Sequence, residues 1–154
     1  MTELTEGMAA PAFTAESNEG TIDLASLAGQ TVVLYFYPKD NTSGCTKEAC
    51  AFRDANDDIR DLGAVVLGVS ADSLTKHANF IDKHDLTFPL LSDPERTLIE
   101  AYGVWKEKKN YGRTYLGIER STFLIDGDGI IRKVWRKVRV KDHVEKVLDA
   151  VRAL

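Results

Sequence analysis

Long apolar runs, an excess of basic residues and abundant cysteine or histidine are all missing from this chain. Its 154 residues include two cysteines and three histidines, and no apolar stretch approaches the roughly 20 residues needed to cross a bilayer. The first residues, Met1–Glu6, hold neither a basic segment nor an apolar signal core. A formal net charge of -4 gives no overall positive field for nucleic acid or an anionic membrane. We therefore expect a cytoplasmic protein without nucleic-acid or membrane partners.

The remaining composition suits one folded domain. Hydrophobic residues make up 44% and charged residues 29% of the chain, as is typical of globular proteins, and this length buries roughly two-thirds of the unfolded surface. No repeat or linker divides the chain, so we expect a single domain over residues 1–154. Two short basic runs, Lys106–Lys109 and Arg132–Lys141, are expected to be solvated faces, with a polyanion site as the alternative.

The first half of the chain shows a strand, a helix and a second strand. Residues 31–37 and 64–70 are continuous apolar runs, typical of strands that are buried on both faces. A helix is predicted between them, because apolar residues recur on one helical face before a glycine stop. This face and its stop comprise Phe52, Ala55, Ile59, Leu62 and Gly63.

The other segments complete an α/β pattern. We predict a short leader hairpin up to Gly20, a helix from Ser73 to His84, a strand near 88–91, a helix over 94–102, strands at 121–125 and 130–138, and a last helix ending at Leu154. The second helix is expected to bury Leu74, Ala78 and Ile81. A βαβ unit followed by a ββα unit is the thioredoxin-like arrangement, a central mixed β-sheet flanked by helices.

A turn-rich segment with both cysteines separates the first long strand from its helix. If the helix begins near Thr42, Cys45 lies in its first turn, where unpaired N–H groups and the positive end of the helix dipole favour a thiolate. Such a strand end is also where ligands commonly bind in α/β sheets. Gly44 allows close approach of the backbone to a small substrate. Thr42 places a hydroxyl within reach of the sulfur or the substrate.

The spacing of Cys45 and Cys50 predicts movement if the two form a disulfide. On a regular helix, five residues correspond to about 7.5 Å of rise and about 140° of rotation. The two Cα atoms would stand roughly 8–9 Å apart, beyond the approximate 7 Å limit for a disulfide. We therefore predict that disulfide formation requires local unfolding of about residues 42–53.

The two cysteines also allow alternatives without this chemistry. They could be small buried hydrophobes, and a Cys–His protease pair could form in space although no histidine is near Cys45 in sequence. A zinc site lacks ligands at suitable spacing, since His77, His84 and His143 are distant. We expect His77 and His84, which share a helix face, to be ordinary surface histidines, with a metal-ligand pair as the alternative.

A cation beside Cys45 is a simpler means of activation. Arg120 is the candidate, because it immediately precedes the strand at 121–125, which we expect near the middle of the sheet. Its guanidinium could reach the thiolate with a fixed charge and several donors. The alternative is an ion pair at the rim, with Glu119 or Glu48, and spacing does not choose between these interpretations.

The cysteine segment resembles the active-site segment of peroxiredoxins. The pattern of that family is proline, three residues, threonine, two residues and cysteine, which Pro38, Thr42 and Cys45 match. A second cysteine five positions later, Cys50, is similar to that of the bacterioferritin comigratory protein group, also called peroxiredoxin Q.

The resemblance covers nearly the whole chain. Arg120–Phe123 resembles the arginine segment of the family, and Gly7–Phe13 resembles its amino-terminal entry. Two departures are visible: Ser43 stands where the group often has proline, and Lys47 where a small polar residue is more usual. Neither departure removes a reacting group, although Ser43 allows a looser loop.

The resemblance implies a thiol peroxidase with a thioredoxin-like fold. Cys45 would be the peroxidatic nucleophile and Cys50 the resolving thiol, joined in an intramolecular disulfide after reaction. The substrates would be hydrogen peroxide and organic hydroperoxides. Thioredoxin or a similar dithiol would be the reductant, and a monomer is the expectation for this group.

The resemblance also implies roles for four neighbouring residues. Thr42 and Arg120 would bind and polarise the peroxide, and Pro38 would shield the sulfenic acid from water. Glu48 would orient Arg120. The family uses no metal, haem or flavin, so no cofactor is expected.

Two other functions remain as alternatives. A thiol–disulfide reductase on the same fold usually carries two cysteines separated by two residues, whereas four residues lie between Cys45 and Cys50. Rapid insulin reduction without peroxide reactivity would favour that function. A non-enzymatic thiol sensor or metal carrier would instead retain metal, or become oxidised without turnover.

Overall fold

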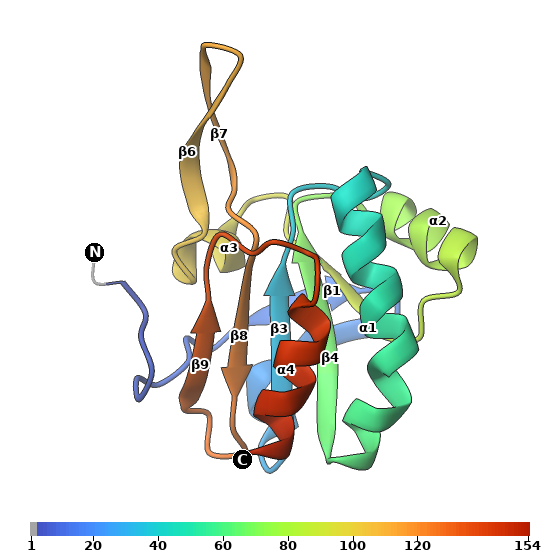
Figure 1. Ribbon diagram of the computed structural model, residues 1–154, viewed down its shortest axis with the longest axis vertical. Coiled ribbons are helices and arrows are strands. Elements are labelled where there is room, and N and C mark those ends of the chain that lie inside the picture. Colours follow the sequence, from blue (N-terminus) through green and yellow to red (C-terminus); the bar gives the residue numbers. More distant parts are fainter. Residues whose placement is uncertain (1–2) are drawn as a thin grey trace.

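A sheet of seven strands forms the centre of the structure, a computed structural model that describes residues 3–154 (Figure 1). The elements are β1 (Thr14–Ser17), β2 (Gly20–Asp23), the 3-10 helix η1 (Leu24–Leu27), β3 (Thr31–Phe36), α1 (Ser43–Asp61), β4 (Ala64–Ser70), α2 (Leu74–His84), β5 (Leu90–Ser92), α3 (Thr97–Ala101), β6 (Trp105–Asn110), β7 (Arg113–Ile118), β8 (Ser121–Ile125), β9 (Ile131–Trp135) and α4 (His143–Arg152). The strand order is β2-β1-β5-β4-β3-β8-β9, and β6 and β7 form a separate two-stranded sheet.

The central strands are buried on both faces, as their apolar runs predict. Alternate side chains of β3 enter different clusters, because successive residues of a strand point to opposite faces. Val33 and Tyr35 lie in the cluster that also holds Phe52 of α1 and Val147 of α4. Val32, Leu34 and Phe36 lie in the opposite cluster with Leu98 and Ile99 of α3.

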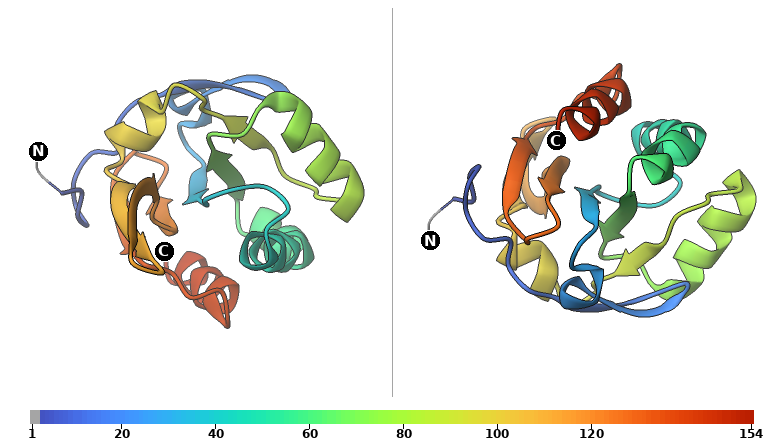
Figure 2. Two further views of the ribbon diagram at one scale, coloured as in Figure 1. Left: turned by 90° about the horizontal axis from the view of Figure 1, so that it is seen from above. Right: turned by 90° about the horizontal axis from the view of Figure 1, so that it is seen from below.

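Chain direction decides which face each helix covers. Strands β3, β4 and β5 are parallel neighbours in chain order, and right-handed crossovers in one direction place both connecting helices on the same face. Phe80 of α2 accordingly joins the cluster of α1 and α4, and α1 and α4 lie side by side (Figure 2). With β8, β9 and α4 completing a ββα unit, the expected thioredoxin-like fold is confirmed.

The register of β3 and β8 positions the arginine. The two strands are antiparallel, with Phe36 opposite Ser121, so Arg120 lies beside the residues that leave the carboxyl end of β3. Strand β8 lies one place from the edge of the sheet, rather than near the middle as predicted, but its pairing with β3 brings Arg120 to the segment that holds Cys45.

Helix α1 begins close to the predicted residue and ends where glycine predicts. Gly63 has a φ of +78°, a conformation that favours glycine and stops a helix. The predicted apolar face is correct for Phe52 and Ile59, which are fully buried, but Leu62 is 43% exposed. The buried face instead continues towards the start of the helix through Cys45, Glu48 and Ala49.

Several other predictions need correction. Helix α2 buries His77 and Phe80, whereas Leu74 and Ala78 are exposed. The helix predicted over residues 94–102 is shorter, because Arg96 has a φ of +64° and α3 begins only after it. Strand β9 is likewise shorter than the predicted 130–138.

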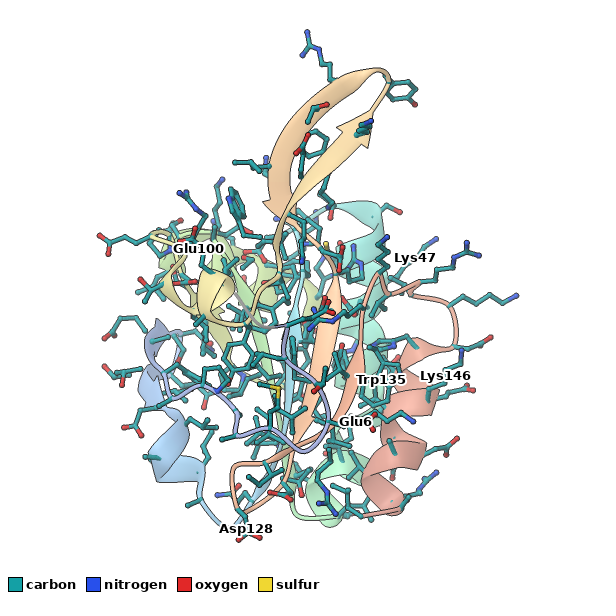
Figure 3. The ribbon with its side chains drawn as sticks, turned by 90° about the vertical axis from the view of Figure 1, so that its left-hand side faces the viewer. Glu6, Lys47, Glu100, Asp128, Trp135 and Lys146 are labelled. Atoms are coloured by element: carbon teal, nitrogen blue, oxygen red, sulfur yellow. The ribbon has the colours of Figure 1, made fainter. Side chains whose placement is uncertain are left out.

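A projecting hairpin, β6–β7, was not predicted. Its first strand has the sequence WKEKKN, which shows no apolar period and favoured a solvated basic run. Tyr111 and Gly112 at its tip both have positive φ values, 52° and 79°, as required in a type I′ turn. The hairpin rises from the end of the molecule where α1 begins, near Lys47 (Figure 3). Among the helices of residues 3–154, none has the length and hydropathy needed to cross a membrane.

Candidate active site

Cys45 is the third residue of α1 and is only 1% exposed. The helix begins after Thr42. Its first backbone hydrogen bond runs from the N–H of Thr46 to the carbonyl of Thr42, at 2.8 Å, so the N–H groups before Thr46 have no partner within the helix. The predicted position in the first turn is therefore confirmed. Free amides and the positive end of the helix dipole favour negative charge on this sulfur.

Arg120 joins the cysteine to a buried carboxylate. Its Nη2 donates to Cys45 Sγ at 3.2 Å, and its Nη1 donates to Glu48 Oε1 at 2.7 Å. Of the alternatives for Arg120, the structure therefore combines two: it reaches the sulfur and also pairs with Glu48. A Cβ atom on Gly44 would lie 3.2 Å from Nη2, so the small residue makes room for the guanidinium.

Glu48 lies in an apolar environment that resists its charge. Its side chain is fully buried, and within the described chain its second oxygen, Oε2, has no hydrogen-bond partner. Burial raises the pKa of Glu48 to about 7, although Arg120 opposes this shift. Burial, followed by the charges of Glu48 and Cys45, also raises the pKa of Tyr35 well above its usual value.

The raised pKa of Glu48 predicts a pH-dependent stability difference from a Glu48→Gln variant. The folded protein retains a proton on Glu48 that the unfolded chain releases above about pH 4.5. Binding of this proton therefore stabilises the folded state at low pH, and the stabilisation is lost as pH rises to about 7. Between pH 5 and 8, we expect wild-type stability to fall by about 2 kcal/mol relative to the variant. Urea unfolding of both reduced proteins measures this difference; parallel pH profiles would contradict it.

Thr42 and Pro38 flank the cysteine in the loop after β3. The hydroxyl of Thr42 is exposed and donates to the carbonyl of Lys39 at 3.0 Å, so its hydrogen is engaged and its oxygen can accept a further hydrogen bond. Pro38 is half-buried. Both residues lie in the predicted segment, and neither side chain makes a hydrogen bond to Cys45.

Cys45 and Cys50 are free thiols in one continuous helix. Cys45 is buried and Cys50 is half-buried. The regular helix between them supports the geometric argument that a disulfide cannot form without unwinding.

Lys108 was not predicted as a neighbour of the site. It projects from β6 across Gly117, whose missing Cβ would lie 3.1 Å from Lys108 Cδ, and its Nζ donates to the carbonyl of Ile118 at 2.7 Å. Burial and the charge of Arg120 lower the pKa of Lys108, while Cys45 and Glu119 act in the opposite direction. A residue in a basic run gives no sequence signal for such a position.

The histidines are placed differently from the prediction. His77 is a fully buried residue, not a surface one, and it bonds to Asp40 and Leu91. His84 is half-buried and packs edge-on to Phe80. Burial, then Lys146 and Arg120, lowers the pKa of His143 to about 4, so it is neutral at pH 7.

The fold is thioredoxin-like, and it holds a buried cysteine in a first helical turn that accepts a hydrogen bond from an arginine. These features define a class of thiol-dependent redox proteins. Comparison with known proteins places the chain within that class. The AhpC/TSA family matches residues 7–134. Peroxiredoxin Bcp of Bacillus subtilis is 52% identical over 147 residues, covering 95% of this chain and 94% of that protein.

Solved structures agree. A cysteine-to-serine mutant of Xylella fastidiosa PrxQ superposes with a TM-score of 0.94 at 37% identity, covering 99% of this chain and 98% of that one. Xanthomonas campestris bacterioferritin comigratory protein, whose structures concern alkyl peroxide reduction, gives a TM-score of 0.87 at 43% identity over 92% and 90% of the two chains. The chain therefore belongs to the AhpC/TSA family, in its Bcp/PrxQ group of peroxiredoxins.

Proposed function

We propose that this protein reduces hydrogen peroxide and organic hydroperoxides through Cys45 and is recycled by a dithiol such as thioredoxin. One observation carries the proposal: Arg120 donates one hydrogen bond to Cys45 Sγ, at 3.2 Å, and another to the buried Glu48. A fixed cation and unpaired amides at one sulfur are what a nucleophilic thiolate requires. The reaction of the relative from Xanthomonas campestris, alkyl peroxide reduction, is of the same type.

In the first step, the thiolate of Cys45 bonds to the distal oxygen of the peroxide and the O–O bond breaks. The other oxygen departs with the electron pair, takes up a proton and leaves as water or an alcohol. Cys45 becomes a sulfenic acid. Because negative charge moves from sulfur to the departing oxygen, donors fixed near both atoms lower the barrier.

The neighbouring residues fit complementary roles in this step. Arg120 Nη2, already beside the sulfur, can donate to the peroxide oxygens without reorganisation. Thr42 donates to Lys39, so its oxygen is suited to accept the O–H of a hydroperoxide. Pro38, half-buried before the loop, would limit access of water to the sulfenic acid.

In the second step, Cys50 condenses with the sulfenic acid, releasing water and forming the disulfide. The first turns of α1 unwind for this step, because the helix holds the two sulfurs apart. A substrate dithiol then exchanges with the disulfide, restoring both thiols and becoming oxidised itself. This cycle needs a reducing compartment, which supports the expected cytoplasmic location. We also propose that the protein acts as a monomer, as the resemblance to the Bcp/PrxQ group implies.

Replacing Arg120 by lysine should slow the peroxide step by about 100-fold, since a removed transition-state donor is worth about 2.7–4 kcal/mol in measured cases. Lysine keeps the charge but has a single nitrogen, which cannot reproduce the geometry in which Nη1 and Nη2 reach Glu48 and the sulfur. Stopped-flow mixing of reduced protein with hydrogen peroxide gives the second-order rate. Arg152→Lys, a change at an exposed arginine on α4, is the matched control. An unchanged rate in Arg120→Lys would remove Arg120 from the mechanism.

A further inference from the structure

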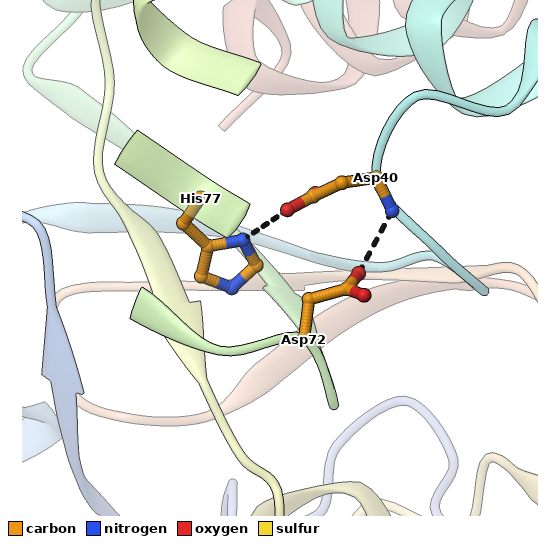
Figure 4. Close-up of side chains that lie close together, drawn as sticks. All are labelled: Asp40, Asp72 and His77. Carbon is orange, nitrogen blue, oxygen red and sulfur yellow. Dashed lines mark hydrogen bonds and ion pairs between the residues drawn. The ribbon is translucent and has the colours of Figure 1, made fainter. Parts of the chain in front are cut away.

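A buried polar network ties the active-site loop to the body of the molecule (Figure 4). Asp40, two residues before the cap of α1, accepts from the hydroxyl of Tyr37 at 2.6 Å and pairs with His77 Nδ1 at 2.7 Å. Its backbone N–H donates to Asp72 Oδ2 at 2.8 Å. His77 Nε2 bonds to the carbonyl of Leu91 at 2.8 Å. The side chains of Asp40 and His77 are 1% and 0% exposed.

The geometry fixes the proton count of this pair. The carbonyl of Leu91 can only accept, so His77 Nε2 carries a hydrogen. The 2.7 Å contact with Asp40 then needs a second proton, on either the ring or the carboxyl. The pair is neutral overall in both cases, which is how a buried acid is tolerated. Asp40, Asp72 and His77 also lie within metal-binding distance of one another, but these bonds already engage their facing atoms.

A second anchor lies further along α1. Asn56 is 2% exposed, and its Nδ2 donates to both the carbonyl and the hydroxyl of Thr87, at 3.1 and 2.9 Å. Arg60 also donates to the carbonyl of Thr87, at 2.7 Å. This part of α1 is therefore fixed to the connection between α2 and β5.

The two anchors bracket the segment that must unwind. Asp40 precedes residues 42–53 and Asn56 follows them, while Cys45 and Cys50 lie between. Both anchors attach to the same part of the chain, since His77 belongs to α2, Thr87 follows α2 and Leu91 belongs to β5. That unit can hold both ends of the segment while its middle opens.

We propose that the α2–β5 unit, residues 74–92, is a frame: it holds both ends of the segment and so confines helix opening to the residues between Asp40 and Asn56. His77 is the positioning residue at the active-site end. The inference rests on the proposed function, because it concerns the disulfide step of that reaction. When the disulfide is reduced, the ends are already in place, so the first turn re-forms with Cys45 beside Arg120.

Amide exchange of the wild-type protein tests the frame directly. The amides of Tyr37 and Asp40 report on the first anchor, since they donate to Val69 and Asp72. We expect oxidation by diamide to accelerate exchange by about 100-fold within residues 46–53, but by less than about threefold at Tyr37, Asp40 and residues 57–61. NMR of reduced and oxidised protein gives these rates residue by residue.

Two substitutions of His77 separate positioning from stability. His77→Asn can keep the donor to Asp40 and loses the bond to Leu91, whereas His77→Gln can keep the bond to Leu91 and loses the donor to Asp40. Each removes one buried hydrogen bond and the ring that shares a proton with Asp40, so both variants are expected to be less stable than the wild type. We expect the glutamine variant alone to show about tenfold faster exchange at Asp40 and about tenfold slower reaction with peroxide.

The proposal is overturned if Asp40 in oxidised wild-type protein exchanges as fast as residues 46–53. It is also overturned if the two variants lose peroxide reactivity equally, which would indicate a purely structural role. The wild-type comparison decides the matter even if neither variant folds. Because diamide forms the disulfide without peroxide, failure of the wild-type protein to react with peroxide would count against the proposed function and leave this test intact.

Discussion

A Cys45→Ser variant should consume no peroxide above background in the presence of any dithiol reductant. Serine is nearly isosteric with cysteine, and its hydroxyl can still accept from Arg120, so the site should keep its shape. A hydroxyl at neutral pH is a weak nucleophile without an adjacent general base, and none of the described residues around Cys45 is placed as that base; Arg120 is a donor. Reaction should therefore stop while folding is retained.

The measurement is peroxide loss with a thioredoxin system, with circular dichroism of the same sample as the folding control. A Cys50→Ser variant serves as the matched comparison, because it makes the same sulfur-to-oxygen change at another position of the same helix. Steady turnover by Cys45→Ser would overturn the assignment of the nucleophile.

A Cys50→Ser variant should complete one stoichiometric turnover and then lose efficient recycling. The site around Cys45 is unchanged by this substitution, so the first reaction with peroxide should proceed at the wild-type rate. The sulfenic acid then lacks its resolving partner, and a second peroxide can convert it to sulfinic acid. Thioredoxin-dependent turnover should fall to a small fraction of the wild-type value.

The peroxide consumed per chain, and the mass of the product, distinguish the outcomes. We expect one equivalent in the first phase, followed by a sulfinic product as peroxide is raised. Full thioredoxin-dependent turnover in Cys50→Ser would show that another thiol resolves the sulfenic acid, and the predicted opening of α1 would lose its purpose.

The cost of that opening sets the competition between resolution and overoxidation. Unwinding through residue 53 exposes Phe52, which is fully buried and packs 4.6 Å from the Tyr35 ring centroid. Exposing one such side chain costs about 1.5–3 kcal/mol. An opening of that size is infrequent, so the sulfenic acid persists long enough for excess peroxide to compete.

The sequence predicts the centre of the fold because burial leaves a simple pattern there. The apolar run of β3, rich in β-branched and aromatic residues, is typical of a strand covered on both faces, and Gly63 predicts the end of α1 through its backbone freedom. The hairpin β6–β7 has no such pattern, since Glu107, Lys109 and residues 113–116 are exposed and its pairing depends on a turn at Tyr111 and Gly112. Strands of this kind are specified by turn geometry more than by hydrophobicity.

The structure brings Arg120 and Glu48 together at Cys45, and the sequence alone could not predict these connections. Spacing brings Arg120 to the sulfur only once β8 is known to pair with β3, and the choice between Glu119 and Glu48 depends on which side chain faces inward. His77 was expected at the surface, because a histidine on a helix carries no sign of its partner. Its partners, Asp40 and the carbonyl of Leu91, are 37 and 14 residues away.

Reaction of the fully reduced protein with one equivalent of peroxide in a stopped-flow instrument, followed by mass analysis, tests most directly whether Cys45 is held as a reactive thiolate. We predict rapid second-order loss of peroxide and an intramolecular bond between Cys45 and Cys50. A folded, reduced protein whose position 45 stays an unmodified thiol after exposure to hydrogen peroxide or an alkyl hydroperoxide would contradict that claim.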